Sequence, residues 1–259
     1  METLNESHRA ADEAVRAAFI SSFFSATTPL KSLALSPYEK SKITQVEQTL
    51  NSTKNEEELD DNLFFPKLVS HAEDGNIIGS VTGIVQTNPE NLLAYTYLTT
   101  THQAHDAHIA SNGQDSSKYP SKTIHVVNDH HNIHYTCRKL PPPLKPRDWL
   151  TRQIFHKPNE NTIKYYSFSI EDNSPFSFTK TTLENIVRGE LSCIHDYERL
   201  PHNQTSFTLR LRVDIKGSVP KKIANMGISG ALDQVYRAYK YFQRDEEIDE
   251  LKVSFVDMK

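Results

Sequence analysis

The sequence predicts an α+β fold in which a sheet wraps around one long C-terminal helix, with further helices at the N-terminus. Residues 217–244 carry apolar side chains at steps of three and four, which is typical of an amphipathic helix. Several segments before it alternate apolar and polar residues, as half-buried strands do. The last of them, 206–215, leads into the helix through Gly217. We therefore expect the sheet to cover the apolar face of this helix.

The C-terminal helix has clear start signals. Ser218 or Val219 can cap it, and Pro220 lies in the first turn, where a missing backbone N–H leaves no partner unpaired. About 25 residues at about 1.5 Å each give a length of roughly 37 Å. The apolar face holds Ile228, Leu232, Val235, Tyr239 and Phe242. The aromatic residues on this helix fit either core packing or a lid over a ligand.

Two helices and an acidic linker are predicted before the sheet. Residues 7–25 have apolar residues at helical spacing, and Ser36-Pro37 begins a second helix that runs to Leu50. Residues 51–62, NSTKNEEELDDN, are polar and acidic, which is typical of a solvated linker. We therefore divide the chain into an N-terminal helical extension with its linker (1–62), a main domain (63–247) and a tail (248–259).

The main domain is predicted to begin with a strand at 76–86. This segment is rich in β-branched residues, and Gly79 and Gly83 allow another element to approach closely. Asn88-Pro89-Glu90 then supplies an N-cap, a proline at the first helical position and a carboxylate at the positive helix end. A helix is therefore expected through Leu98, followed by a further helix through Ala110.

The remaining segments are predicted to be strands. Residues 123–127 and 132–138 form a hairpin around the turn 128–130. Candidate strands follow at 147–156, 162–170, 187–197 and 206–215. The last of them alternates strictly, so one of its faces should lie on the C-terminal helix.

Composition excludes several classes of protein. The net charge is −4 over 259 residues and no basic run stands out, which argues against binding nucleic acid through phosphate contacts. The two cysteines, Cys137 and Cys193, form no C-x-x-C pair, so we expect a reducing compartment. No segment approaches the roughly 20 apolar residues of a membrane-spanning helix. We expect a monomer in the cytoplasm.

Residues 139–149, KLPPPLKPRDW, carry the most specific signal in the chain. They match the pattern K-x-P-x-P-x-x-x-R-D-[FYW] and resemble the StAR-related lipid transfer (START) family. Two further segments agree with the order of elements in this family: T-N-P-E (87–90) before a helix, and G-x-V-P (217–220) before the last helix. The resemblance covers roughly 63–244. It implies the helix-grip fold, in which a curved antiparallel sheet encloses a tunnel for one lipid or sterol under the C-terminal helix.

The sequence departs from this pattern at one position. Many family members that bind sterols or phospholipids have an arginine six residues after the motif arginine, where this chain has Gln153. Arg152 is one residue away, and because strand side chains alternate, it should point to the opposite face unless a bulge intervenes. The usual charge is therefore expected to be missing from the tunnel.

The resemblance and the strand pattern together give a set of candidate ligand contacts. They are one face of the strand at 147–156, one face of the strand at 206–215, and the apolar face of the last helix: Trp149, Thr151, Gln153, Phe155, Leu209, Leu211, Val213, Ile228, Leu232 and Tyr239. The alternative is that Trp149 packs on the outer side of the sheet against an N-terminal helix, and that Leu150, Arg152 and Ile154 line the tunnel instead. The apolar tip of the proline loop, Pro142, Pro143 and Leu144, lies between lysines and is expected either to touch membranes or to form a rigid turn.

The sequence contains 12 histidines, gathered above all in THQAHDAH (101–108) and DHHNIH (129–134). Positions i, i+3 and i+6 of a helix drift by about 60° per step, so His102, His105 and His108 would not converge on one ion. The sequence has no H-E-x-x-H motif. We expect solvated surface histidines, no metal and no cofactor.

Catalytic motifs are also absent from the sequence. There is no G-x-S-x-G elbow, and Cys137 and Cys193 are expected to lie in the sheet core. Arg147 and Asp148 could act as a base and an acid, but a structural ion pair at the start of a strand is the favoured interpretation.

The expected function is non-enzymatic binding of one lipid or sterol, for transfer or for sensing, with transient contact to a membrane surface. An enzyme of the wider polyketide-cyclase-like superfamily is the main alternative; it would use a titratable group such as Arg188, Glu190 or His195. A third alternative is a ligand-sensing module of a larger protein, because residues 250–259 resemble a strand that is cut short.

Overall fold

The computed structural model describes residues 2–24, 34–51, 57–59, 65–71, 76–98, 101, 104, 106, 108, 120–170, 185–217 and 219–256. The helices in these ranges are α1 (Glu2–Phe24), α2 (Pro37–Asn51), α3 (Pro89–Tyr97) and α5 (Lys221–Val256). The strands are β1 (Glu57–Leu59), β2 (Lys67–His71), β3 (Ile77–Val85), β4 (Ser121–Asn128), β5 (His131–Arg138), β6 (Arg147–Asn159), β7 (Thr162–Ser169), β8 (Val187–Arg188), β9 (Glu190–Leu200) and β10 (Gln204–Asp214).

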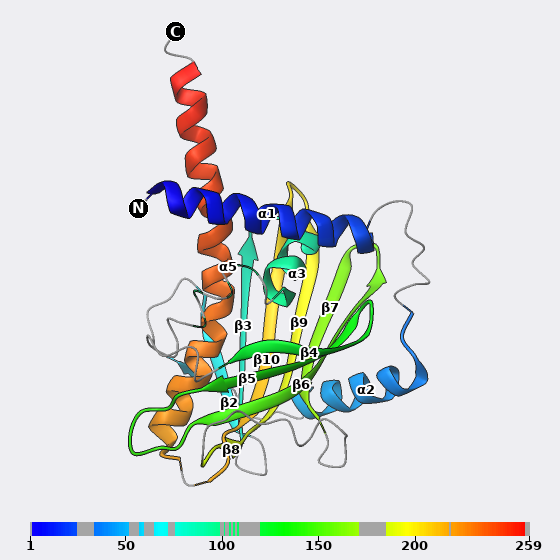
Figure 1. Ribbon diagram of the computed structural model, residues 1–259, viewed down its shortest axis with the longest axis vertical. Coiled ribbons are helices and arrows are strands. Elements are labelled where there is room, and N and C mark those ends of the chain that lie inside the picture. Colours follow the sequence, from blue (N-terminus) through cyan, green and yellow to red (C-terminus); the bar gives the residue numbers. More distant parts are fainter. Residues whose placement is uncertain are drawn as a thin grey trace.

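The strands form one sheet in the order β1-β2-β3-β10-β9-β7-β6-β5-β4, with β8 paired to β6. All neighbours on the main path are antiparallel, and β8 is parallel to β6. Figure 1 shows the sheet curving so that β4, β5 and β6 pass in front of the other strands, while α5 runs along the β2–β3 side. The sheet is therefore bent around an interior that faces α5, and we call this side the inner face.

The helix α5 packs most closely on β3. A Cβ atom added to Gly79 would lie 2.6 Å from Cγ2 of Ile228, and one added to Gly83 would lie 2.8 Å from Cγ1 of Val235. Real Cβ atoms do not approach so closely, so only glycine fits at these two positions while α5 stays where it is. The apolar face predicted for this helix lies in the main core cluster with β3, β9 and β10.

The opposite, outer face of the sheet is covered by α2. Its apolar residues Ile43, Val46 and Leu50 form a second core cluster with side chains from β3, β6, β7 and β9. These are Ile78, Ile154, Tyr166, Phe168 and Ile194. Alternate residues of β7 are therefore buried on both faces of the sheet, from Tyr165 to Phe168.

The helix α1 crosses one end of the sheet and lies over α3 (Figure 1). Phe19, Phe23 and Phe24 surround Phe155 of β6, with ring centroids 5.7, 5.9 and 6.1 Å from it. Arg16 donates a hydrogen bond of 2.6 Å to the hydroxyl of Tyr241 on α5. The N-terminal helix therefore closes this end of the fold and is tied to the C-terminal helix. The last turns of α5 project beyond α1 (Figure 1).

Most predicted elements are confirmed. The strand at 76–86, the helix after Asn88, the hairpin at 123–138 and the strands from 147 to 215 occur as β3, α3, β4–β5 and β6–β10. The side chain of Asn88 accepts a hydrogen bond from the N–H of Asn91, as expected of an N-cap. The further helix expected through Ala110 falls mainly outside the described residues.

Two predictions about secondary structure were wrong, and one strand was missed. The linker at 51–62 contains the short strand β1, and β2 was not predicted. In β2 a core-facing position is occupied by Lys67, whose Nζ lies 2.6 Å from Asp233 Oδ1 of α5, so the usual apolar alternation is broken by a buried ion pair. The predicted strand after Asp249 is also wrong, because α5 continues as helix to Val256.

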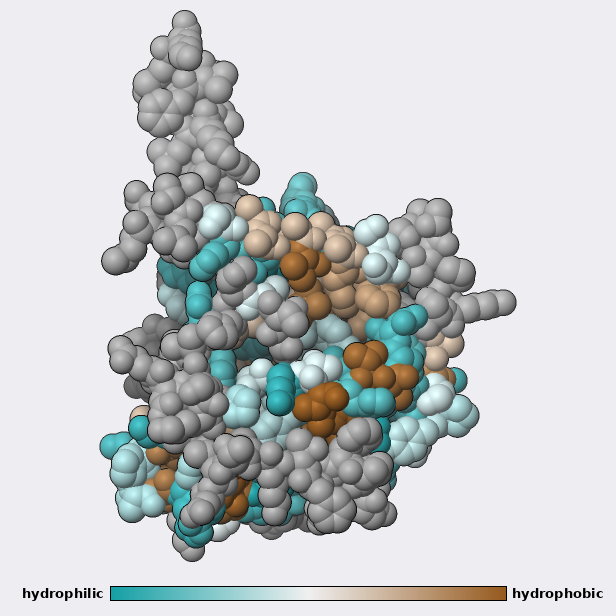
Figure 2. All heavy atoms as spheres, viewed as in Figure 1, coloured by the Kyte–Doolittle hydropathy of each residue, from teal (hydrophilic) through white to brown (hydrophobic). Residues whose placement is uncertain are grey.

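The surface carries some apolar area. Figure 2 shows it over α1 and over the region of β4, which lies at one edge of the sheet. On β4, Val126 and Val127 are 65 and 44 % exposed. None of the described helices is long and apolar enough to cross a membrane.

Candidate functional site

The candidate site is the inner face of β5 and β6. The two strands are antiparallel neighbours, and their register places Asn132 opposite Gln153, His134 opposite Thr151, and Thr136 opposite Trp149. Phe155, further along the same face of β6, belongs to the core cluster that contains α5. Because side chains alternate along a strand, Trp149, Thr151, Gln153 and Phe155 all lie on the inner face, as predicted from the sequence.

Arg152 lies on the other side of the sheet. Its guanidinium donates a hydrogen bond of 3.2 Å to His131 Nε2 and lies 5.3 Å from the centre of the Tyr38 ring on α2. This placement confirms that the arginine next to Gln153 points away from the inner face.

One side of the inner face is apolar and closely packed. The predicted contacts Leu209, Leu211, Ile228 and Leu232 lie here, and none of them is more than 2 % exposed. Val213 is half-buried and packs against the same cluster. Tyr239 is half-buried too, and its ring lies 5.4 Å from that of Phe65. The predicted apolar residues are therefore brought together in one cluster, which forms the wall of the inner face on the side of α5.

The side formed by β5 and β6 is polar. Asn132, His134 and Gln153 are 6, 5 and 7 % exposed, so they are almost fully buried. In the described part of the chain, Asn132 Oδ1, His134 Nδ1, Gln153 Oε1 and Trp149 Nε1 have no hydrogen-bond partner. The sequence pattern identified Trp149 and Gln153 but missed Asn132 and His134. The signal that could have identified them is that they lie two residues apart on the predicted strand 132–138, so both side chains point to the same face.

His134 is held neutral by its surroundings. Its Nε2 lies 3.0 Å from the Ser121 hydroxyl of β4. Burial, together with the positive charge that His108 can carry, lowers the pKa of His134 to about 4. At neutral pH the side chains of Asn132, His134, Trp149 and Gln153 are therefore all uncharged.

A second inner-face histidine is already paired. His195 Nδ1 lies 2.7 Å from the hydroxyl of Tyr197, which in turn lies 2.6 Å from Thr96 Oγ1 of α3. Burial lowers the pKa of His195 to about 3. Of the other two titratable candidates, Glu190 is exposed with a carboxylate oxygen 2.9 Å from Lys216 Nζ, and Arg188 pairs with Asp148.

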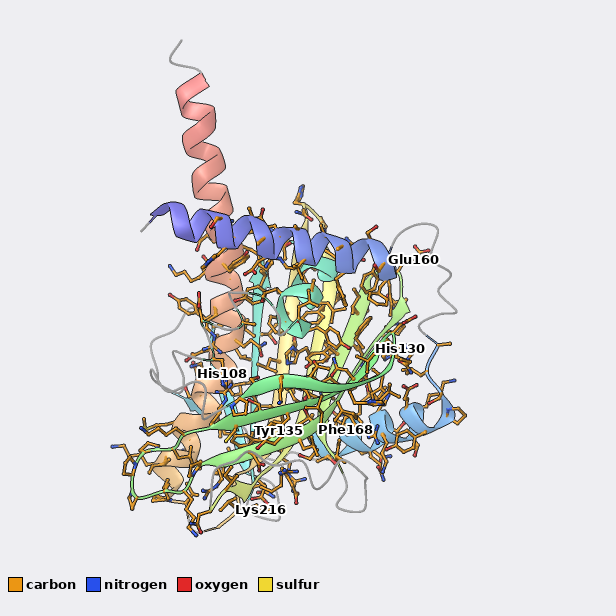
Figure 3. The ribbon with its side chains drawn as sticks, in the orientation of Figure 1. His108, His130, Tyr135, Glu160, Phe168 and Lys216 are labelled. Carbon is orange, nitrogen blue, oxygen red and sulfur yellow. The ribbon has the colours of Figure 1, made fainter. Side chains whose placement is uncertain are left out.

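The motif arginine Arg147 joins three segments at one end of the inner face. Its guanidinium donates to the carbonyl oxygens of Lys145 in the proline loop and of Ile215 and Lys216 before α5. The last two bonds are 2.7 and 3.1 Å long; Figure 3 labels Lys216 there. Arg147 therefore fixes the loop and the start of α5 to the first residue of β6.

The motif aspartate Asp148 has different partners. It accepts two hydrogen bonds from Arg188, of 2.8 and 2.9 Å, and one of 3.0 Å from the hydroxyl of Tyr135. The predicted ion pair between Arg147 and Asp148 is therefore wrong. The two side chains leave β6 on opposite faces, so neighbouring positions in the sequence serve separate contacts.

The proline loop is exposed at its tip. Pro142 and Pro143 are exposed and Leu144 is half-buried. The N–H of Leu144 donates to the carbonyl of Pro141, which closes a turn. The residues predicted to contact a membrane are thus held on a short turn next to Arg147.

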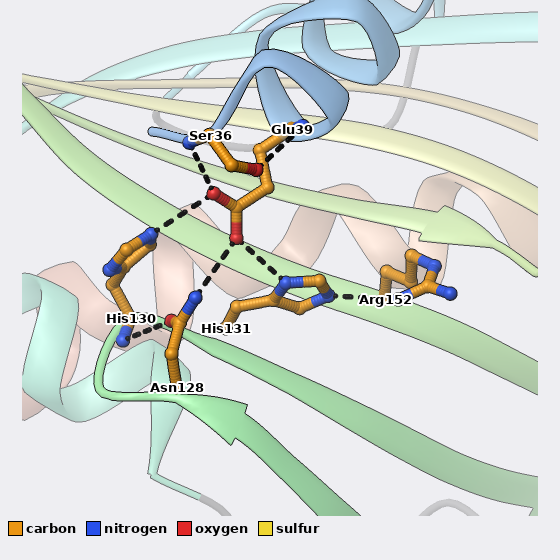
Figure 4. Close-up of polar contacts among 6 residues, drawn as sticks. All are labelled: Ser36, Glu39, Asn128, His130, His131 and Arg152. Carbon is orange, nitrogen blue, oxygen red and sulfur yellow. Dashed lines mark hydrogen bonds and ion pairs between the residues drawn. The ribbon is translucent and has the colours of Figure 1, made fainter. Parts of the chain in front are cut away.

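The expectation of surface histidines in 129–134 was wrong, because His130, His131 and His134 are each at most 5 % exposed. His131 Nδ1 donates to Glu39 Oε1 of α2 at 2.8 Å, and His130 Nε2 lies 3.5 Å from Glu39 Oε2. Asn128 donates to the same carboxylate (Figure 4). These contacts attach α2 to the end of the β4–β5 hairpin.

Glu39 also caps its own helix. Its carboxylate accepts from the N–H of Ser36 at 2.8 Å, and the Ser36 hydroxyl accepts from the N–H of Glu39 at 3.3 Å. This is a capping box, and the spacing S-x-x-E in the sequence was the signal that could have predicted it. Burial alone would raise the pKa of Glu39, but the hydrogen bonds from Ser36, Asn128 and His131 outweigh it and lower the pKa to about 2.

The described residues contain no group of three or more histidine, cysteine, aspartate or glutamate side chains arranged to hold a metal ion. His102 and His105 lie outside the described ranges, so the structure does not place the His102, His105 and His108 set.

Comparison with known proteins adds one finding. A scan of protein-family models and a search of curated protein sequences each gave no match. Solved structures do match. The human StarD13 (DLC2) lipid transfer and protein localization domain superposes with a TM-score of 0.56 at 13 % identity, covering 81 % of this chain and 98 % of that one.

Two further human structures match similarly. StAR-related lipid transfer protein 5 gives a TM-score of 0.55 at 14 % identity over 79 % of this chain and 95 % of that one. STARD10 gives 0.54 at 15 % identity over 83 % of each chain. At such identities the likeness concerns the fold alone. The fold of this chain is the helix-grip fold of the START domains.

Proposed function

We propose that this chain binds one lipid or sterol on its inner face, between the polar side of β5–β6 and the apolar wall at β10 and α5, and carries out no reaction on it. The observation that carries the proposal is the helix-grip fold itself, shared with domains whose names describe lipid transfer. The motif segment 139–149 supports it, because Arg147 places the proline loop at the end of the inner face.

The energy available from burial is sufficient for such a function. At about 25 cal/mol per Å2, burying roughly 400 Å2 of apolar ligand surface contributes about 10 kcal/mol. This offsets the loss of translational and rotational freedom on binding without any covalent chemistry. The set Trp149, Thr151, Gln153, Phe155, Leu209, Leu211, Val213, Ile228, Leu232 and Tyr239 remains the proposed contact surface.

Binding is favoured over catalysis by the placement of the titratable candidates. Arg188 is engaged by Asp148 and Glu190 is an exposed partner of Lys216. His195 lies on the inner face but is hydrogen-bonded to Tyr197. An enzyme would need one of them to meet its substrate. Turnover of a polar acyl substrate by the purified protein would favour the enzyme.

The proline loop is the proposed point of entrance and of transient membrane contact. Pro142, Pro143 and Leu144 form its tip, and the exposed Lys139 and Lys145 flank it. An apolar tip with cationic flanks suits an anionic bilayer surface. Because Arg147 ties this loop to the start of α5, contact with the bilayer would act on both edges of the entrance together.

Native mass spectrometry of freshly purified protein tests the proposal directly. A co-purifying mass in the range of a lipid or sterol is expected. Fluorescence then locates it, because Trp149 is the only tryptophan of the chain. A bound brominated sterol or fatty acid should quench its emission saturably; binding without quenching would move the site away from the inner face of β6.

A further inference from the structure

We propose that the ligand carries an uncharged hydrogen-bonding group, a hydroxyl or an amide, which is received inside the fold by Asn132, His134 and Gln153. The inference rests on the proposed function and names the class of lipid. It concerns the polar patch of the inner face, defined as Asn132, His134, Trp149 and Gln153.

The patch is compact because of the strand register. Asn132 and Gln153 are direct cross-strand partners, and His134 is opposite Thr151 in the next inner-facing row. Side chains in such positions have Cβ atoms about 5 Å apart. Trp149 lies four residues from Gln153 along β6, about 13 Å away, and its Nε1 would be 2.6 Å from a Cβ added to Gly189. One small polar group can therefore meet Asn132, His134 and Gln153 together, with Trp149 further along the same face.

Each side chain of the patch has one buried polar atom without a partner in the described structure, although Asn132 is also hydrogen-bonded to Tyr97 and His134 to Ser121. Asn132, His134 and Gln153 are each more than nine-tenths buried. Among the described residues, one polar atom on each of these three side chains, and Nε1 of Trp149, makes no hydrogen bond. Buried polar atoms in folded proteins nearly always have partners. Three such atoms lie together on one face of two neighbouring strands, at Asn132, His134 and Gln153, where a ligand group would complete the bonding.

The chemistry of these atoms describes the group that fits. The two amide oxygens accept hydrogen bonds, the indole N–H donates one, and the imidazole Nδ1 can do either. A hydroxyl group both donates and accepts, and so does a carboxamide. Either group can therefore satisfy two or more members of the patch together.

The side chains of the patch offer no charge of their own to pair with a charged group. Its inner-facing neighbours on β5, β6 and β7 include Thr136, Thr151, Phe155, Tyr165 and Ser167, and His108 lies near enough to His134 to affect its pKa. Burial keeps His134 neutral by lowering its pKa to about 4. On the same face of β5, Arg138 lies four residues beyond His134, and burial together with Arg237 of α5 lowers the pKa of its guanidinium; the buried Lys67 already pairs with Asp233. A phosphate held at Asn132 and Gln153 would lie about 20 Å along β5 from Arg138, and a phosphate buried without a cation is strongly disfavoured.

The test uses two probes that share one tail. Delipidated full-length protein is titrated with dibromostearyl alcohol and with dibromostearyl phosphate, and quenching of Trp149 reports binding. The alcohol is expected to bind at least about tenfold more tightly than its phosphate, because only the alcohol can be buried with its bonds satisfied. Equal affinity, or tighter binding of the phosphate, would overturn the inference.

Variants connect the preference to the patch. Gln153→Leu should reduce the preference for the alcohol to a few-fold at most. Arg152→Leu is the matched control, since it changes the neighbouring residue on the outer face and should leave the preference unchanged. If Gln153→Leu keeps the full preference, the patch does not receive the head group. Should either variant fail to fold, the wild-type comparison of the two probes still decides.

The failure of this inference can be told from failure of the proposed function. If neither probe quenches Trp149 and no lipid co-purifies, lipid binding itself is refuted. If both probes bind equally, lipid binding stands and the proposed head-group chemistry falls.

Discussion

The two faces of the β5–β6 pair use the same strands for opposite purposes. On the outer face, His131 has a hydrogen-bonding partner at each ring nitrogen, Glu39 on one side and Arg152 on the other. On the inner face, the adjacent residues Asn132 and Gln153 each keep a buried oxygen without a partner in the described structure. Burial alone therefore does not reveal a polar residue's role. Unpaired buried atoms of described residues also occur on the outer face, at His156 Nε2 and Arg210 Nε, so it is the grouping of Asn132, His134 and Gln153 on the inner face that supports the proposed ligand contact.

The largest loss of stability should come from removing the carboxylate of Glu39, which attaches α2 to the β4–β5 hairpin on the outer face. Glu39→Ala removes a helix cap and three further contacts to the hairpin, so it should lower the free energy of unfolding by about 3 kcal/mol. Urea denaturation measures this change. Glu160→Ala, at an exposed turn, is the control and should change stability by less than about 0.5 kcal/mol. If Glu39→Ala matches this control, α2 is not held by the carboxylate.

The stability that these Glu39 contacts contribute should decrease at acidic pH. The pKa of Glu39 is lowered from 4.5 to about 2 in the folded protein, so folding favours the carboxylate. The resulting stability, at most about 3 kcal/mol, is fully present above pH of about 4.5 and is lost as the pH falls toward about 2. Denaturation measured across this window should show a steeper loss in the wild type than in Glu39→Gln. Parallel curves for the two proteins would contradict the assignment.

Substitutions of Arg152 and Gln153, neighbours on β6, should change stability less than Glu39→Ala does, and by different amounts. Arg152→Leu removes the donor to His131 and should cost about 1 to 2 kcal/mol. Gln153→Leu replaces an unsatisfied amide with an apolar side chain of similar size, so stability should stay within about 1 kcal/mol of the wild type or rise. Thermal unfolding of both variants sharpens the comparison. A severe loss in Gln153→Leu would mean that the amide is structural after all.

The smallest effect on stability should come from the proline loop. Leu144→Asp lies on an exposed turn and should change the free energy of unfolding by less than about 0.5 kcal/mol. Lipid transfer between liposomes should nevertheless slow, because a carboxylate at the tip is repelled by an anionic surface. Unchanged transfer rates would remove this loop from the entrance.

The fold could be largely predicted because alternation and helical spacing are local signals. The strands from 147 to 215 and the helix after Gly217 each carry such a pattern. The resemblance of residues 139–149 to the START motif then indicated how these elements are arranged in the fold. β2 was missed because Lys67 occupies a core-facing position, which becomes understandable only once its partner Asp233 is known. The tail was mistaken for a strand because its β-branched residues outweighed the continuity of the helix before it.

The residues of the proposed site could be predicted only in part. The alternation along β6 placed Trp149 and Gln153 on one face, which the register confirms, since period two is intrinsic to a strand. Asn132 and His134 were missed because a histidine-rich hairpin gives no sign of which side is buried. Their role depends on the register with β6 and on cover from other elements, and neither is encoded locally.

The seam between α5 and β3 has a mechanical consequence. Because Gly79 and Gly83 leave no gap beneath Ile228 and Val235, the helix can neither slide nor roll on the sheet without steric overlap. Space for an arriving molecule must then come from the opposite side, where β4 is an edge strand and the turn at 139–146 is exposed. Amide hydrogens of β3 should accordingly exchange only on global unfolding, while those of β4 and β5 exchange through smaller local openings. The β4–β5 hairpin would then open locally while α5 keeps its position on β3.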